Sequence, residues 1–242
     1  MRKYFFLLLL LSTAIVSCKK QTETLPVDDI ANLYPLKVGK VFIYRLDSTR
    51  LVNRAFATAY YLAKDTIEST FLDIQGRTAF RIFRYITDTL ESQPYVYSDT
   101  YYAVITNSRV EYVDNNKRFI TLANPASLNN SWLGNTYLGT DQLPITNNTS
   151  YDGWNYQYIA VQQPYTVIKG TFPNTVTVQQ ADNSFGTPNS GELSSKTYSI
   201  EVYANGVGLI YKEFMDYFYQ TTPTPAFEDN SYGIKLNLVD YK

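Results

Sequence analysis

Hydrophobic and polar residues alternate with a period of two in many short runs of this chain. Runs such as VFIYRLDS (41–48), TAFRIFRYIT (78–87) and YGIKLNLVDYK (232–242) add many β-branched and aromatic residues, which is typical of half-buried strands. No segment of twelve residues after residue 17 sustains the i, i+3, i+4, i+7 spacing of an amphipathic helix. The pattern predicts one all-β domain of about nine to twelve strands over residues 34–242.

Turn-forming residues separate these runs and indicate antiparallel neighbours. Asn205-Gly206 lies between two strand-like halves, a strong hairpin signal, and TNS (106–108) and DNNK (114–117) divide another stretch. Residues 124–153 are rich in Asn, Leu and Gly, and this composition predicts a long loop with short strands. Because a long antiparallel sheet tends to curl or close, we expect a curved sheet that forms a half-barrel or barrel. A two-sheet β-sandwich is the alternative.

The N-terminus has the layout of an export signal. Within residues 1–17, two basic residues precede the uncharged run YFFLLLLLSTAIV. The sequence Ile15-Val16-Ser17-Cys18 resembles the lipobox of bacterial lipoproteins, and by that resemblance Cys18 becomes the first mature residue and carries diacylglycerol. Two or more acyl chains hold a protein stably to a membrane. Residues 18–33 have no hydrophobic period and predict a flexible tether.

The residue after the cysteine indicates the membrane to which the protein is sorted. Lys19 in this position, in place of aspartate, resembles lipoproteins that are sorted to the outer membrane of Gram-negative bacteria. We therefore expect a lipid-anchored protein of the outer membrane, on either its periplasmic or its outer face. An ordinary signal peptide followed by a chance cysteine is the alternative.

Composition excludes several chemistries. The chain has no histidine and one cysteine, so Ser-His-Asp hydrolysis, histidine zinc sites and thiol catalysis in a lipidated chain are not available to it. Without residues 1–17 the net charge is about −3, since Arg2 and Lys3 leave and every acid stays, and this charge does not fit a nucleic-acid partner. We expect no cofactor and no metal; the acidic pairs Asp28-Asp29 and Glu228-Asp229 fit solvated loop charges better than calcium ligands.

A pair of carboxylates is the remaining route to catalysis, because glycoside hydrolysis needs no histidine. Glu111, Asp114, Asp141 and Asp152 are the candidates, and no motif assigns a role to any of them. The sequence therefore favours a protein that is not an enzyme.

Three motifs together resemble uncharacterised lipoproteins of Bacteroidetes. YPLKVGKVFIYR (34–45), GTFPNTVTV (170–178) and EVYANGVGLIYKEF (201–214) are similar to elements that recur in this order in those families, although Phe42 stands where they usually have tryptophan. The resemblance extends to LolA-like or DUF3108-like half-barrels, and it implies a curved antiparallel sheet.

Short Asp-Ser/Thr segments resemble the acceptor motif of O-glycosylation in Bacteroidetes. They place candidate sites at Ser48, Thr66 and Thr89, which the resemblance would put on exposed turns. Motifs of three residues also recur by chance.

Aromatic residues carry the functional hypotheses, since the chain has 23 Tyr, 13 Phe and 2 Trp. The first hypothesis is binding of a hydrophobic ligand or lipid within the curved sheet. The alternatives are a surface module that binds a glycan or an envelope protein, with Trp132 and Trp154 as stacking faces, or a structural component of the envelope. Burial of both tryptophans against the sheet is the simpler interpretation for side chains of this size.

Overall fold

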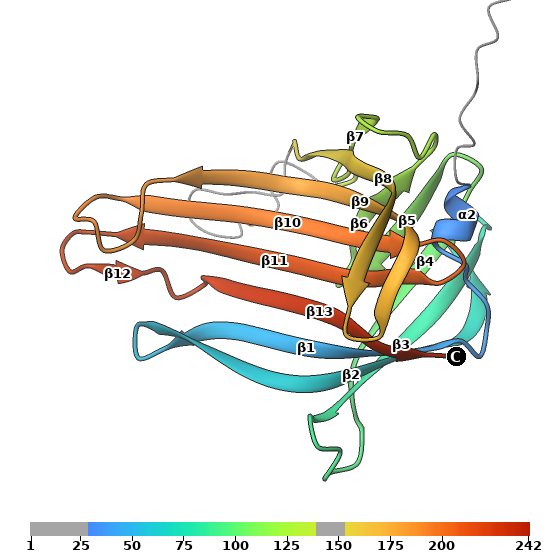
Figure 1. Ribbon diagram of the computed structural model, residues 1–242, viewed down its shortest axis with the longest axis horizontal. Helices are drawn as coiled ribbons and strands as arrows, with labels where there is room; N and C mark the ends of the chain where they lie inside the picture. Colours follow the sequence, from blue (N-terminus) through green and yellow to red (C-terminus); the bar gives the residue numbers. More distant parts are fainter. Residues whose placement is uncertain (1–28, 139–152) are drawn as a thin grey trace, which may run out of the picture.

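The computed structural model describes residues 29–138 and 153–242, in which one antiparallel sheet holds thirteen strands (Figure 1). The strands are β1 (Val41–Val52), β2 (Ala55–Leu72), β3 (Thr78–Asp88), β4 (Val96–Ile105), β5 (Arg109–Asp114), β6 (Lys117–Ala123), β7 (Ser131–Leu133), β8 (Asn155–Val167), β9 (Gly170–Phe185), β10 (Ser194–Ala204), β11 (Gly208–Gln220), β12 (Ala226–Phe227) and β13 (Tyr232–Tyr241). The all-β prediction is confirmed.

The sheet consists of two meanders joined by the first and last strands. Its order is β6-β5-β4-β3-β2-β1-β13-β11-β10-β9-β8-β7, and the two-residue strand β12 pairs with β11 outside this path. β1 pairs with β2 on one side and with β13 on the other, in a register that runs from Phe42 opposite Tyr241 to Arg50 opposite Tyr232. The first and last strands thus pair with each other in the middle of the sheet.

The two outer strands approach each other and bring the sheet close to a closed barrel. The Ile120 amide of β6 donates to the Gly134 carbonyl at 2.8 Å, and Trp132 Nε1 of β7 donates to the Ile120 carbonyl at 2.7 Å. Tyr158 of β8 reaches the same edge, where its hydroxyl bonds both the amide and the carbonyl of Ala123. The predicted curved sheet is confirmed in its barrel form, and the β-sandwich alternative is wrong.

A short helix, α2 (Ile30–Leu33), packs against one end of the barrel. Asp29 Oδ1 accepts a hydrogen bond from the Ala31 amide and caps the helix. Ile30 and Leu33 are 1% and 0% exposed. The prediction of a flexible tether over 18–33 is therefore wrong for these last residues, because the spacing of their two apolar side chains buries both in the core.

The turn between β10 and β11 also lies at the α2 end. Gly206 has a φ of 78°, the left-handed region that favours glycine, and its amide donates to the Asn32 carbonyl at 2.8 Å. The hairpin predicted at Asn205-Gly206 is confirmed, and its turn helps to hold α2 in place.

The β8–β9 hairpin crosses the neighbouring strands and bonds to β13 (Figure 1). The Lys169 amide donates to the Leu238 carbonyl at 2.8 Å, and the Ile168 amide donates to Asn237 Oδ1 at 2.7 Å. This crossing adds a second layer over part of the sheet. Within the described ranges, no helix has the length and apolar character needed to span a membrane.

Candidate functional site: the barrel cavity

Two adjoining cavities of about 150 and 170 Å³ lie inside the barrel, and we refer to them together as the barrel cavity. Their linings come from strands all around the sheet, which places the space in the interior. The residues shared by both cavities are Tyr112, Asp114, Thr121, Glu201, Lys212 and Ile234. The first cavity continues along Tyr34, Phe42 and Tyr101, and the second along Trp154, Tyr156 and Phe214.

Two ion pairs line the cavity, and each joins residues that are directly opposite on neighbouring strands. Asp65 of β2 faces Arg84 of β3, with Oδ2 and Nη2 2.6 Å apart, and Glu201 of β10 faces Lys212 of β11, with Oε1 and Nζ 2.9 Å apart. Buried charges are tolerated when they are paired and hydrogen-bonded. The interior of the barrel is therefore polar at these two positions and not uniformly apolar.

Tyrosine hydroxyls complete these pairs. Tyr101 donates to Asp65, and Tyr203 donates to Glu201 Oε2 at 2.5 Å. Burial first, and the neighbouring carboxylate second, raise the pKa of both phenols well above the ordinary value of 10.0. Both rings therefore stay neutral donors at physiological pH.

Asp114, at the end of β5, differs from the other two acids of the cavity. It is half-buried, and Lys117 lies directly opposite it in the register of β5 and β6. Asn115 Nδ2 donates to its Oδ1 at 3.1 Å. Burial, followed by the charge of Asp99, raises the pKa of this carboxyl, although the charges of Lys212, Arg84 and Lys117 act in the opposite direction.

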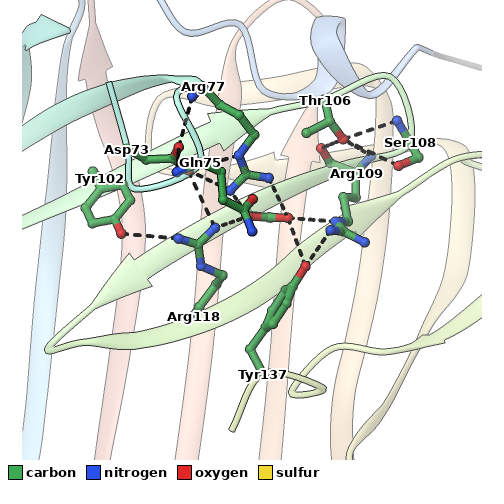
Figure 2. A network of polar contacts seen from close by, with 10 residues as sticks. Asp73, Gln75, Arg77, Tyr102, Thr106, Ser108, Arg109, Arg118 and Tyr137 are labelled. Atoms are coloured by element: carbon green, nitrogen blue, oxygen red, sulfur yellow. Dashed lines mark hydrogen bonds and ion pairs between the residues drawn. The ribbon is translucent and has the colours of Figure 1, made fainter. Parts of the chain in front are cut away.

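A second charged cluster surrounds Glu111 of β5, and we name it the arginine network. Figure 2 shows Arg77, Arg109 and Arg118 converging in this cluster. Arg77, Arg109 and Arg118 all donate hydrogen bonds to the Glu111 carboxylate. Arg77 Nη2 lies 2.7 Å from Oε2, and Arg109 Nε lies 2.7 Å from Oε1. Tyr137 also donates to it, at 3.2 Å. Glu111 is 0% exposed.

The arginine network holds separate parts of the chain together. Asp73, in the turn after β2, bonds Arg77 at 2.7 Å and also accepts from backbone amides of that turn. Burial would raise the pKa of Glu111, but the hydrogen bonds from the three arginines outweigh it and lower the pKa to about 2. Both carboxylates of the network are paired with arginines, and these ion pairs join the turn after β2 to β5 and β6, which is a structural role.

Comparisons with known proteins give two similar solved structures. One is a candidate lipoprotein from Parabacteroides distasonis ATCC 8503, with 14% identity, a TM-score of 0.39, and coverage of 87% of this chain and 98% of that one. The other is a candidate exported protein with a YmcC-like fold from Bacteroides fragilis NCTC 9343, with 11% identity, a TM-score of 0.35, and coverage of 86% and 98%. No protein-family model and no curated protein matches the sequence.

The structure describes two of the four acids predicted as catalytic candidates, and it does not bring these two together. Glu111 belongs to the arginine network and Asp114 lines the barrel cavity, on opposite faces of the same strand. A water or sugar ring cannot lie between these two carboxylates, so they do not form the pair that glycoside hydrolysis requires. Asp141 and Asp152 lie outside the described residues.

Both tryptophans pack near the seam where the sheet ends approach. Trp132 stacks at a tilt on Tyr158, with ring centroids 4.9 Å apart, and Trp154 is 8% exposed in the main core cluster. Trp154 also lines the second cavity. An open stacking face for sugars is thus absent at Trp154, whereas contact with an interior ligand is possible there.

The three candidate glycosylation sites lie in different settings. Thr89 is exposed in the turn after β3, where the Asp88 carboxylate accepts from the Leu90 and Gln93 amides. Ser48 and Thr66 lie within β1 and β2. The expectation of exposed turns is wrong for these two, because the alternating pattern that predicts the strands continues through both motifs.

The acidic pairs considered for calcium have other contacts. Asp29 caps α2, and Glu228 accepts from Gln220 Nε2 at 2.5 Å. Among the described residues, no group of three or more His, Cys, Asp and Glu side chains is arranged to hold a metal ion. Asp28 and the predicted lipidation site, Cys18, lie outside these residues.

Sequence reasoning missed the two interior ion pairs. A signal was present, because Asp65 alternates with Ala63 and Ile67 on a face that is otherwise apolar. Its partner could not be found from the sequence, since a register shift between Ile67 and Ser69 changes which residues of β3 face β2.

Proposed function

We propose that this protein is a lipid-anchored component of the outer membrane that binds a small, mostly apolar molecule inside its barrel. The observation that carries the proposal is the barrel cavity, which is walled by aromatic rings and interrupted by a few charged groups. Apolar walls with a small number of placed polar groups are typical of ligand sites. The lipobox-like sequence at Cys18 supports the anchor.

The size of the cavity narrows the expected ligand. An engineered protein cavity of about 150 Å³ binds benzene, and each half of the barrel cavity has a similar volume. Together the halves reach the lower end of the range of about 300–1,000 Å³ for ligand pockets. A compact molecule of one or two rings fits this space better than a lipid with two acyl chains.

An outer aromatic cluster supports a second candidate function, recognition of a glycan. Tyr85 and Tyr97 pair edge to face, with centroids 6.2 Å apart, and Tyr97 is 57% exposed. Lys64 lies 5.3 Å from the centroid of Tyr85 and 4.2 Å from that of Tyr95. Exposed rings beside a cation offer stacking and hydrogen bonding to a sugar.

Mass spectrometry of the full chain from a Gram-negative host tests the first proposal. The denatured mass is expected to correspond to a chain that starts at Cys18 and carries acyl groups. Under native conditions we expect added mass from a bound small molecule, or saturable binding of phenethyl alcohol as a neutral probe. Ile234→Trp, which fills both halves of the cavity, should abolish this binding.

Ile159→Trp is the matched control, because Ile159 is 41% exposed on β8. It should bind the probe as the wild type does. An unmodified cysteine would contradict the anchor. The interior site would be contradicted if the protein carried no bound molecule and also failed to bind the probe. Equal binding of the probe by the two tryptophan variants would contradict it as well.

A further inference from the structure

The connections between the strands lie at two opposite ends of the barrel, and the two ends differ in charge. Neighbouring strands are antiparallel, so the chain reaches the α2 end and the far end in turn. Together with the helix cap Asp29, the connections at the α2 end contain the bases Lys37, Lys40 and Arg77 and one further acid, the buried Asp73. These connections are residues 34–40, 73–77, 106–108, 124–130 and 205–207.

The far end is acidic in the part of the chain that the structure describes. Its connections contain the acids Glu91, Glu192, Glu228 and Asp229 and one base, Arg54. They are residues 53–54, 89–95, 115–116, 186–193, 221–225 and 228–231. The formal charge of these groups is therefore −3 at the far end and +1 at the α2 end. A surface of anionic lipids attracts the α2 end and repels the far end.

Two lysines of the loop before β1 lie close together at the α2 end. Lys37 is exposed, and burial, followed by the charge of Lys37, lowers the pKa of Lys40. Val38 lies between them and is 47% exposed. The Gly39 amide holds this loop on the sheet, because it donates to the Ile67 carbonyl at 2.8 Å. An apolar side chain flanked by cations is typical of segments that bind at a membrane interface.

A second apolar side chain at the α2 end projects from the turn between β2 and β3. Ile74 is 96% exposed. Asp73 Oδ1 accepts from two backbone amides of this turn at 2.9 Å, and Arg77 binds Glu111 in the arginine network. The network thus fixes an apolar side chain in contact with water. Leu90 at the far end is 86% exposed as well, so the charge distinguishes the two ends and apolar exposure does not.

The predicted lipid anchor is attached through the α2 end. Asp29 caps α2 there, and Cys18 precedes it by eleven residues. A segment of this length spans at most about 40 Å. The 13 residues of β11 alone extend over about 43 Å. Only a tether stretched to its limit would therefore let the far end touch the membrane.

We infer that the α2 end docks on the anionic surface of the membrane that carries the Cys18 lipid. Lys37 and Lys40 then lie near the lipid headgroups, and Val38 and Ile74 lie at the boundary with the acyl chains. This inference rests on the lipid anchor of the proposed function, because it states how the anchored barrel is oriented. It does not depend on a ligand in the barrel cavity. The acidic far end faces away from the membrane.

Spin labels on the lipidated full chain test this orientation in vesicles of phosphatidylethanolamine and phosphatidylglycerol. Ile74→Cys and Leu90→Cys form a matched pair, because both side chains are apolar and exposed but lie at opposite ends. Cys18 is the only native cysteine, and a sulfur that carries diacylglycerol cannot take the label. By electron paramagnetic resonance, we expect the label at 74 to be relaxed by oxygen, which enters lipid, more than by a water-soluble nickel complex. The label at 90 should show the reverse.

Charge reversals in the Ile74→Cys background test the electrostatic part. Each cation near an anionic surface favours binding by about fivefold, so Lys37→Glu should lower the ratio of docked to undocked protein more than tenfold. Arg54→Glu makes the same change of charge at the far end and should leave this ratio unchanged.

Equal effects of these two reversals would overturn the inference. An acylated protein whose labels at 74 and 90 are equally open to the nickel complex would also overturn it and leave the anchor intact. If mass spectrometry finds no acyl group on Cys18, the anchor of the proposed function fails, and the inference fails with it.

Discussion

Glu111 and Asp114 are three residues apart on one strand, yet their surroundings are opposite. Glu111 is fully buried outside the cavity, accepts from three arginines, and has its pKa lowered to about 2. Asp114 lines the cavity, lies opposite Lys117 in the strand register, and has its pKa raised by burial and by Asp99. A carboxylate held by three arginines stabilises the fold, whereas one whose burial outweighs its cationic neighbours destabilises the fold when it is ionised.

The two acids also differ in what their removal leaves behind. Loss of Glu111 would leave Arg77, Arg109 and Arg118 close together around one remaining acid, Asp73. Loss of the Asp114 charge would remove an ionised form that burial and Asp99 disfavour. The same change of charge is therefore expected to have opposite effects on stability at the two positions.

The largest loss of stability is expected for Glu111→Ala. Removing one partner of a buried charge network costs about 3–5 kcal/mol, because the remaining charges are left uncompensated. For a chain of this size each kcal/mol lowers the melting temperature by about 2–4 °C. Urea unfolding should show the loss, and Asp114→Ala serves as the comparison from the same strand. Equal losses in the two variants would remove the distinction drawn between them.

A fall in pH is expected to lower the free energy of unfolding by an intermediate amount. Glu111 and Asp73 have folded pKa values of about 2, below their ordinary values of 4.5 and 3.8. Because a lowered folded pKa contributes stability above the unfolded value, this stability should be lost as the pH falls from about 5 toward 2. Urea unfolding across this range measures it. A Glu111→Gln variant that keeps the full slope of the wild type would contradict the assignment.

The smallest effect, of opposite sign, is expected for Asp114→Asn. A folded pKa above the unfolded value means that folding disfavours the ionised form, so ionised Asp114 destabilises the protein at neutral pH. Removing the charge should raise stability by up to about 0.5 kcal/mol, the usual limit for sites that are not fully buried. Differential scanning calorimetry at neutral pH can detect the corresponding rise. A clear fall in melting temperature would indicate a partner for Asp114.

The alternation of side chains was enough to predict strands and a curved sheet, because that pattern is local. YGIKLNLVDYK reads as a strand and is one, β13 (Tyr232–Tyr241). The pairing of β13 with β1 could not be predicted, since nothing near either strand specifies a partner so distant in sequence. The arginine network was hidden for the same reason: Arg77, Glu111 and Arg118 lie on three segments that only the sheet order brings together.

No local pattern distinguishes Asp114 from the other acids of the chain. It lies in DNNK, which reads as a solvated turn, and its position facing the cavity depends on the register of β5 with both neighbours. A bulge between Val110 and Glu111 sets part of that register. The helix α2 within the predicted tether could not be recognised either. It has only four residues, which is shorter than the window needed to detect a helical period.

The pairing of β1 with β13 has a consequence for the order of folding events. Phe42 and Tyr241 are neighbours in the sheet although almost the whole described chain separates them. Contacts of such large sequence separation form late and slow the folding rate, because the entropy of closing the intervening loop is lost before they form. Until β13 (Tyr232–Tyr241) has formed, β1 is paired on one side only, with β2, and its other edge stays open to pairing with another strand.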